Sequence, residues 1–288
     1  MVKLHVKKGD QSLFLYETQT PANIEDVTNV LVKIHNGKLK IERLGYEIEE
    51  LSKYGVCLPP NMQGLASEQI VDLKLKDDWA DKNLQTLDYK VNKDPIGRRN
   101  GLAPSEKYAD ILTKTTAEAK TRVSQKLMDS GVCLTIDTIQ ETLDILKGAV
   151  MITYPMGLPS YDIVHLELEG KEDLTGTQAS KEVLEECKTE LWWANKPLDK
   201  SKTLGDYVGK NEKSKIIVKL QKKGLGAPSR EPVLTEQQRK DLMLAEFHHR
   251  EDLKKLEIDN DDSHLNSAWA DNQQLKKTFL GLNKIKFK

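Results

Sequence analysis

The chain has 288 residues, and its 44 lysines and arginines nearly balance its 45 aspartates and glutamates. The resulting net charge of −1 argues against a general nucleic-acid-binding protein, because such proteins usually carry a basic excess. Hydrophobic residues make up 38% of the chain and charged residues 31%, which predicts a folded core together with a solvated helix or tail. At about 150 residues per domain, the length predicts roughly two domains.

The cysteines and the first residues indicate the compartment. Cys57, Cys133 and Cys187 are odd in number and widely spaced, which is typical of free thiols in a reducing environment. Residues 1–8 interleave charged with apolar residues, so we expect no secretory signal. No uncharged run approaches the about 18 apolar residues of a membrane span. We therefore expect a cytoplasmic protein with no membrane partner.

The pattern of elements predicts an α+β fold in several parts. An N-terminal α/β module is expected over residues 1–76, and a loop or hinge over residues 77–103. A helical segment is expected over residues 104–147, followed by a ubiquitin-like β-grasp domain over residues 148–226. Residues 227–288 are expected to form a charged helical C-terminal arm.

Strong periodic signals lie in the N-terminal module. Alternation over residues 2–7, a turn at Gly9-Asp10 and a returning strand over residues 13–18 predict a β-hairpin. Apolar residues at helical spacing then predict two helices, over residues 24–34 and 41–51.

Local signals define the ends of these and the following helices. Asn23 is the expected N-cap of the first helix, and Asn36-Gly37 its expected stop. Many breakers and few apolar residues make residues 77–103 a predicted surface loop. Beyond it, we expect a long helix over residues 104–128 and a shorter one, capped by Thr135 or Asp137, with an apolar face that extends to Leu146.

The β-grasp prediction depends on the order of elements after Gly148. The expected elements are two strands, a helix and a final strand, over residues 149–154, 163–168, 177–195 and 216–220. Residues 203–220 also resemble the last loop and strand of ubiquitin. On the expected helix, Leu184, Cys187 and Leu191 are predicted to face the core.

Candidate interaction residues lie in this domain and in the arm. Trp192 and Trp193 are adjacent, so only one of them can face the core from a helix, and the other is a candidate contact for a partner. Packing of that tryptophan against the chain's own tail is the alternative. The last 14 residues carry five lysines and no acid. The candidates in the arm are two apolar anchors and two lysines, Trp269, Phe279, Lys276 and Lys277. A flexible tail without a partner is the alternative.

Lysines also gather around the expected last strand. They are Lys210, Lys213, Lys215, Lys219, Lys222 and Lys223. A solvated face is the favoured interpretation, and a site for an acidic partner is the alternative.

Motifs for catalysis, metals and nucleotides are incomplete. The segment 205–210 has three residues between its glycines, where a phosphate-binding loop has four, and Asn211 replaces the Ser or Thr that holds Mg²⁺. The cysteines are too far apart for a zinc site, and His248 and His249 point about 100° apart on a helix. We therefore expect no enzyme, no cofactor, no metal and no small-molecule substrate.

A set of short stretches resembles one protein family along most of the chain. They are LPPNMQGL (58–65), IGRRNG (96–101) together with Asp94, GAVMI (148–152), YPMGLP (154–159), KEDL (171–174), GTQA (176–179), LWWA (191–194), DYVGKNEK (206–213) and WADN (269–272). The stretches occur in order, and the total length fits. The chain thereby resembles the Kurly family, also called cilia- and flagella-associated protein 298.

The resemblance implies a non-enzymatic adaptor or assembly factor for motile cilia. Such a factor supports cytoplasmic assembly of axonemal dynein arms and the orientation of cilia. Dynein-assembly factors are the implied partners, with axonemal dynein subunits as further candidates and nucleic acid excluded. The implied location is the cytoplasm and the basal body of the cilium, with the cilium itself as a further candidate. A structural component bound stably to the axoneme is the alternative, and a ubiquitin-like modifier is disfavoured because 62 residues follow Gly224-Leu225-Gly226.

Overall fold

The computed structural model describes residues 1–65, 67–77, 79, 89–228 and 236–258. The chain divides into two compact units, residues 1–230 and residues 231–288, and each is considered by itself. The first unit mixes helices with a five-stranded sheet, which confirms the α+β prediction. Within the described ranges, none of the helices has both the length and the apolar character that crossing a membrane requires.

Both ends of the first unit contribute to its main sheet. The strands are β1 (Val2–Lys8), β2 (Gln11–Thr18), β5 (Thr189–Trp193), β6 (Lys196–Pro197) and β7 (Lys215–Lys222). Their order is β2-β1-β7-β5-β6. β1 pairs antiparallel with β2, as the predicted hairpin requires, and parallel with β7. β5 runs antiparallel to both β7 and β6.

Helices fill the long connection between β2 and β5. They are α1 (Ile24–Tyr54), α2 (Ser67–Asp72), α4 (Glu106–Arg122), α5 (Gln125–Asp129), α6 (Ile136–Thr153), α7 (Ile163–Glu169) and α8 (Gln178–Glu182), followed by a 3-10 turn (Glu186–Lys188). A short ribbon, β3 (Tyr89–Val91) with β4 (Leu102–Pro104), lies among them. The helix α9 (Leu204–Val208) follows β6, and α10 (Glu236–Ile258) belongs to the second unit.

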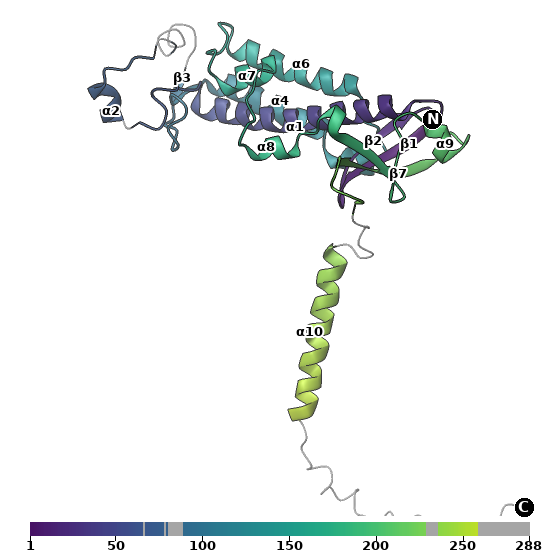
Figure 1. The fold of residues 1–288 in the computed structure, drawn as a ribbon. Helices are drawn as coiled ribbons and strands as arrows, with labels where there is room; N and C mark the ends of the chain where they lie inside the picture. The colour runs from purple at the N-terminus through teal and green to yellow at the C-terminus, as the bar shows by residue number, and fades with distance from the viewer. Residues whose placement is uncertain (66, 78, 80–88, 229–235, 259–288) are drawn as a thin grey trace, which may run out of the picture. The chain divides into compact units, whose positions relative to one another are not determined.

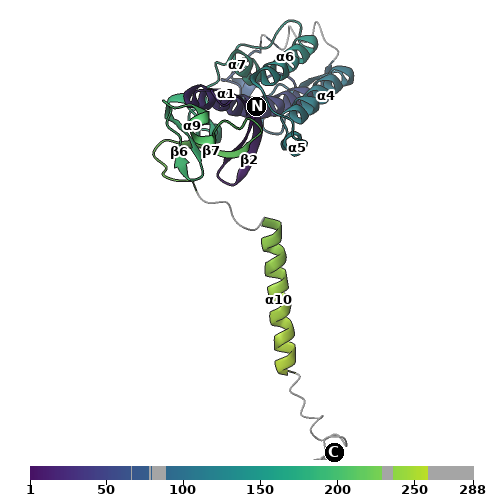
Figure 2. The same ribbon diagram turned by 90° about the vertical axis from the view of Figure 1, so that its right-hand side faces the viewer.

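Helix α1 connects the sheet to the helical layer. The Asn23 side chain accepts a hydrogen bond from the backbone N–H of Glu25, which confirms the predicted N-cap. From there α1 extends away from the strands to lie beside α4 and α6 (Figure 1). Figure 2 shows α1, α4, α6 and α7 gathered on one side of the strands. One helix therefore contributes to both parts of a continuous core.

The predicted helix stop at Asn36-Gly37 is wrong, because α1 continues through both residues. The Asn36 side chain exchanges two hydrogen bonds with the backbone of Leu184, at 2.7 and 3.0 Å. A Cβ atom at Gly37 would lie 2.5 Å from Cγ2 of Ile139 in α6. Asn36 and Gly37 therefore serve contacts with distant parts of the chain, whereas the sequence pattern assigned them to a local helix end.

The predictions of strands over residues 149–154 and 163–168 are also wrong. Residues 149–153 continue α6, where Ala149 and Val150 are buried while Met151 and Ile152 are exposed. That alternation by pairs follows a helix packed on one side, whereas a half-buried strand alternates residue by residue. Residues 163–169 form α7, with Asp162 as N-cap and Gly170 in the left-handed conformation at its end.

The predicted helix over residues 177–195 is replaced by α8, the 3-10 turn and β5. Leu184 and Leu191 are buried as predicted, but Leu184 lies outside the helices and Leu191 lies in β5. Cys187, predicted to face the core, is exposed. The expected β-grasp elements at residues 149–154, 163–168 and 177–195 are therefore not formed, whereas the final strand at 216–220 lies within β7.

Two glycines inside helices allow a matched test of the packing between α1 and α6. We expect Gly37→Ala to lower the free energy of unfolding by about 1–2 kcal/mol, because overpacking against the stiff Ile139 outweighs the better helix propensity of alanine. The Cβ atom added by Gly148→Ala in α6 meets no atom within 4 Å. This substitution is expected to raise the free energy of unfolding by up to about 1 kcal/mol. Urea denaturation of both variants measures these changes. Stabilisation by Gly37→Ala would show that the two helices pack differently.

Candidate interaction surface

The two adjacent tryptophans lie on β5 and not on a helix, so their side chains leave opposite faces of the sheet. Trp193 packs against the hydrophobic core. Trp192 is half-buried on the other face, paired across the sheet with Lys219 of β7 and Pro197 of β6. The structure thus identifies Trp193 as the inward residue and Trp192 as the one on the opposite face of the sheet. The role of Trp192 in binding stays a prediction.

We define the outer face as the side of the central strands that points away from α1. On the inner side, Val2, Leu4 and Val6 of β1 are completely buried. The outer face comprises the residues between them and their neighbours on β7 and β5, namely Lys3, His5, Lys7, Lys215, Ile217, Lys219 and Trp192. Strand alternation in the sequence indicated which residues point outward, but not that β1 and β7 would bring them together.

The register of β1 and β7 places like charges opposite each other. Lys3 is aligned with Lys215 and Lys7 with Lys219. Between these two pairs, His5 is aligned with Ile217, whose side chain is 43% exposed. Like charges at paired positions of a sheet are destabilising. The outer face is thus a basic surface with an exposed apolar centre.

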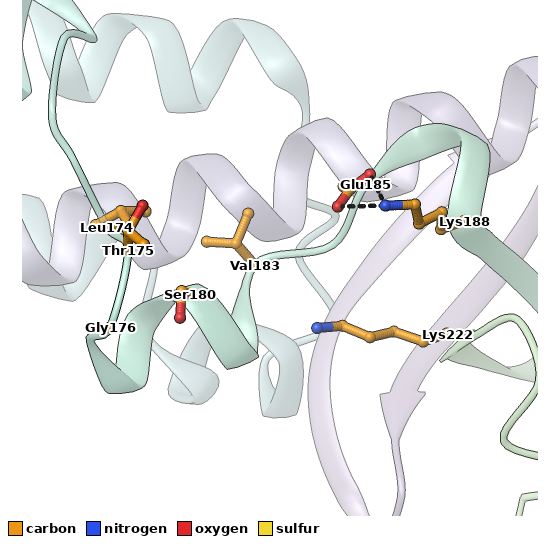
Figure 3. A pocket seen from close by; sticks show the side chains of 8 residues that line it. All are labelled: Leu174, Thr175, Gly176, Ser180, Val183, Glu185, Lys188 and Lys222. Carbon is orange, nitrogen blue, oxygen red and sulfur yellow. Dashed lines mark hydrogen bonds and ion pairs between the residues drawn. The ribbon is translucent and has the colours of Figure 1, made fainter.

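A pocket of about 390 Å³ lies beside α8 and the start of β5 (Figure 3). Its charged groups are already engaged with the chain. The Lys222 ammonium, which points toward α8, donates a hydrogen bond to the carbonyl of Lys181 at 2.8 Å. Lys188 forms an ion pair with Glu185 at 2.9 Å. We therefore assign these side chains the structural task of holding residues 178–188 in place.

A second lysine reaches the same helix end. Lys8 of β1 donates to the carbonyl of Glu182 at 3.0 Å. Burial lowers the pKa of Lys8; the nearby Glu182 carboxylate opposes this shift and Lys222 reinforces it. Because cations are favourable at the C-terminal end of a helix, Lys8 and Lys222 together stabilise α8 against the sheet.

The most deeply buried charges form a cluster at the end of α1. Arg99 is only 4% exposed, and its guanidinium donates to the carbonyl of Gly55 at 2.9 Å and to a carboxylate oxygen of Glu47 at 2.8 Å. Asp162, which is fully buried, lies 4.0 Å from the same guanidinium. The Asp162 carboxylate also accepts from the backbone N–H of Cys57 at 2.8 Å. The cluster therefore fastens three separate chain segments together.

Asp94 organises the loop of residues 94–99 that carries Arg99. Its carboxylate accepts hydrogen bonds from the backbone N–H groups of Ile96, Arg98 and Arg99 at 2.8–2.9 Å. Burial acts to raise the pKa of Asp94, but these bonds and the Arg99 charge outweigh it, so the pKa lies below its usual range. The prediction of a surface loop or hinge over residues 77–103 is thus wrong for Asp94 and Arg99, which are buried; part of that segment lies outside the described residues.

The Cys57 thiol beside this cluster is an unreactive group. Burial, followed by the Asp162 charge, raises the pKa of Cys57 to about 11. A nucleophilic cysteine needs a lowered pKa and some exposure. Cys57 is therefore a free thiol, as predicted, and it is buried.

The buried carboxyl group of Glu167 in α7 and the half-buried one of Glu172 lie close to Arg43 of α1. Arg43 lies 2.8 Å from Glu172 and 3.8 Å from Glu167, which is only 5% exposed. Burial, and then the Glu172 charge, raise the pKa of Glu167 to about 8. Glu167 is therefore largely protonated in the folded protein at neutral pH.

The segment 205–210, which resembles an incomplete phosphate-binding loop, has a role in packing. Gly205 is the second residue of α9, and its backbone N–H donates to the carbonyl of Thr20 at 2.8 Å. A Cβ atom at Gly205 would lie 3.2 Å from that carbonyl oxygen, which explains the glycine. Among the described residues there is no group of three or more histidines, cysteines or acids that could hold a metal ion.

The second unit contributes one described element, α10. Its large apolar side chains are exposed: Leu242, Met243, Leu244, Phe247 and Leu253. The predicted contact residues Trp269, Lys276, Lys277 and Phe279 lie outside the described residues. The helical character predicted for the arm is confirmed over Glu236–Ile258.

Comparisons with known proteins identify relatives along the whole chain. The family model described as "Cilia- and flagella-associated protein 298" matches residues 189–285. Proteins of that name from Danio rerio and Homo sapiens are 52% identical over 287 residues and 50% identical over 288 residues. A Drosophila melanogaster protein of the same name is 45% identical over 288 residues. Each alignment covers 100% of this chain and 99% of the relative, and no solved structure matches.

Adjacent arginines provide a test of the buried cluster. Replacing Arg99 by methionine leaves Asp162 and Glu47 without their buried cation, so we expect a loss of about 3–5 kcal/mol in the free energy of unfolding. Arg98 contacts the same Glu47 but is 40% exposed, so Arg98→Met is expected to cost less than about 1 kcal/mol. Chemical denaturation gives both values. If Arg99→Met does not fold, Arg99→Lys serves in its place, and equal costs at both positions would contradict a buried cluster.

The raised pKa of Glu167 predicts a pH dependence of stability. A group whose folded-state pKa, about 8, exceeds its ordinary value of 4.5 contributes stability that is complete below the unfolded-state pKa. That contribution is lost as the pH rises through the folded-state pKa. We expect the free energy of unfolding to decrease between about pH 5 and pH 8, and Glu167→Gln to remove this decrease. Glu169→Gln, on an exposed residue of the same helix, is expected to retain it.

Proposed function

The chain belongs to the cilia- and flagella-associated protein 298 family, and from this premise we propose that it is a non-enzymatic adaptor or assembly factor of motile cilia. It supports the cytoplasmic assembly of axonemal dynein arms and the orientation of cilia. The observation that carries the proposal is the full-length similarity to relatives from fish, mammals and fly, which share a name that refers to cilia.

The form of the chain supports an adaptor. The first unit places its most deeply buried charges in clusters that hold the fold together, as Arg99 and Asp162 do. Its basic surface lies on the sheet, and the second unit offers a helix whose large apolar side chains are exposed. Exposed apolar and aromatic residues are typical contacts in protein–protein interfaces.

The proposed partners are dynein-assembly factors, with axonemal dynein subunits as further candidates. The proposed locations are the cytoplasm and the basal body. For the arm, we propose that Trp269, Phe279, Lys276 and Lys277 contact such a partner, together with the apolar side chains of α10.

For the fold, we propose a ubiquitin-like β-grasp core assembled from residues 1–54 and 189–222. The order of elements is typical of that fold: a hairpin, a helix, two strands, a short helix and a last strand parallel to the first. The remaining helices are then an insertion between the helix and the third strand. This differs from the sequence-based expectation of a β-grasp domain within residues 148–226.

A structural component of the axoneme is the competing function, since the names of the relatives fit both. Fractionation of ciliated cells separates the two. An assembly factor is expected mainly in the detergent-soluble fraction of the cell body, whereas an axonemal component is expected to resist detergent and remain with the doublet microtubules.

Deletion of the second unit tests the adaptor proposal. In motile-ciliated cells that lack their own relative of this protein, we expect the full chain to restore beating and dynein arms. We expect residues 1–230 to recover fewer dynein-assembly factors in co-purification and to restore neither. The melting temperature of residues 1–230 is measured alongside, so that misfolding is not mistaken for a lost contact. Full rescue of beating by residues 1–230 would contradict the role of the arm.

A further inference from the structure

We propose that the exposed face of α6 binds a basic amphipathic helix of a partner polypeptide. An apolar side chain of that helix lies over Gly148, beside Met151 and Ile152, and its basic residues face Glu141 and Asp144. The inference goes beyond the proposed function, because it concerns a surface of the first unit that the proposal for the arm does not involve.

The exposed face of α6 is defined by the helical period. Its members recur every three or four residues along one side of the helix and are Asp137, Glu141, Asp144, Gly148, Met151 and Ile152. The other side carries the residues that pack into the core, which are Ile139, Leu146, Ala149 and Val150. Both views show α6 at the border of the helical layer (Figure 1, Figure 2). The contacts of α6 with α1 and α4 therefore use the side opposite the exposed face.

The glycine on this face is the first observation. Gly148 lies in the interior of α6 without a positive φ, so the backbone does not require a glycine there. A Cβ atom at Gly148 would meet nothing within 4 Å, so no close contact in the described part of the chain requires it either. Glycine is less favourable than alanine inside a helix. A partner that approaches the helix backbone would explain the glycine, as the contact with Ile139 does at Gly37.

The second observation is a pair of apolar side chains beside this open space. Met151 and Ile152 follow Gly148 by three and four residues, and each is 61% exposed. Long side chains of a helix lean toward its N-terminal end, so both are directed to the turn that contains Gly148. Packed helices place the side chains of one between those of the other. One apolar side chain of a second helix therefore fits over Gly148, in contact with Met151 and Ile152.

The third observation is the charge of the same face. Asp144, Glu141 and Asp137 lie one, two and three turns before Gly148, and none of them forms an ion pair with another residue that the structure describes. Asp144 accepts a hydrogen bond from the neutral Gln140 at 3.2 Å. The helix dipole favours an acid at Asp137 in the first turn, but the other two acids lie beyond that turn. A row of carboxylates at this spacing is complementary to basic residues on a second helix.

A helix fits this face better than other partners do. Side chains three and four residues apart on α6 match the same spacing on a helix laid along it, whereas an extended strand presents side chains at every second residue. A nucleic acid or an anionic membrane would be repelled by the three carboxylates. The proposed partner is therefore a helix with a row of basic residues beside an apolar one.

The test uses the full chain and a fluorescein-labelled amphipathic peptide of alanine, leucine and lysine, about 18 residues or five helical turns long. Fluorescence anisotropy in low salt measures its binding. We expect Gly148→Leu to weaken binding at least about tenfold, because the added side chain fills the space that the peptide needs. Glu141→Lys is expected to weaken it by a similar factor through like-charge repulsion. The matched control Glu25→Lys, at an exposed position in the first turn of α1, is expected to alter affinity less than about twofold.

Both test variants are expected to fold, which separates lost binding from lost structure. Leucine has a better helix propensity than glycine and meets no atom near its Cβ position at Gly148. Glu141→Lys replaces the like-charge pair of Asp137 and Glu141, four residues apart, by an opposite-charge pair. The melting temperature of each variant is therefore expected to equal or exceed that of the wild type.

Four binding results would overturn the proposal. They are no peptide binding by the wild-type chain, a loss of less than about twofold for Gly148→Leu, equal losses for Glu141→Lys and Glu25→Lys, and equal binding of a peptide with glutamate in place of lysine. Light scattering adds a fifth: a wild-type dimer that Gly148→Leu converts to a monomer would assign the face to a second copy of the chain. All are obtained without cilia, so a failure here is distinct from a failure of the proposed function.

Discussion

The parallel pairing of β1 with β7 is the interaction on which the rest of the first unit depends. It joins a strand that begins at Val2 to a strand that begins at Lys215, through bonds such as that from the Lys3 N–H to the Ser214 carbonyl at 3.0 Å. Parallel strands require a crossover connection, and here the described helices of the first unit lie within it. The same pairing aligns completely buried residues on one side and lysines on the other.

Helix α1 is the second constraint, because the sheet and the helical layer both pack on it. Near its middle, Asn36 binds the backbone of Leu184 and Gly37 allows the close approach of Ile139. At its end, the Gly55 carbonyl receives the Arg99 guanidinium. Buried ionic contacts of this kind are weak evidence for net stability but are costly to break, so they favour one arrangement of the loops over others.

The charged groups that hold the fold together are distinct from the residues on its surface, and this distinction bears on function. Asp94, Arg99 and Asp162 satisfy one another and nearby backbone groups within the fold, and Lys8 and Lys222 stabilise the end of α8. The paired lysines of β1 and β7 lie on the outer face of the sheet, outside these clusters. A protein that presents a basic surface with an apolar centre, and a separate helix with exposed apolar residues, has the form expected of an adaptor.

The sequence by itself determined the elements whose signals are local. The hairpin, the Asn23 N-cap, the helical stripes of α1 and the strand near residue 216 follow from alternation, capping chemistry and 3.6-residue spacing. It also indicated that one of Trp192 and Trp193 faces the core. Only the tertiary structure decided that Gly37 lies inside a helix, that residues 149–153 are helical and that β1 pairs with β7. In each case the cause is a contact between residues far apart in the chain: Gly37 with Ile139, α6 with α1, and β1 with β7. A local sequence pattern cannot predict such a contact.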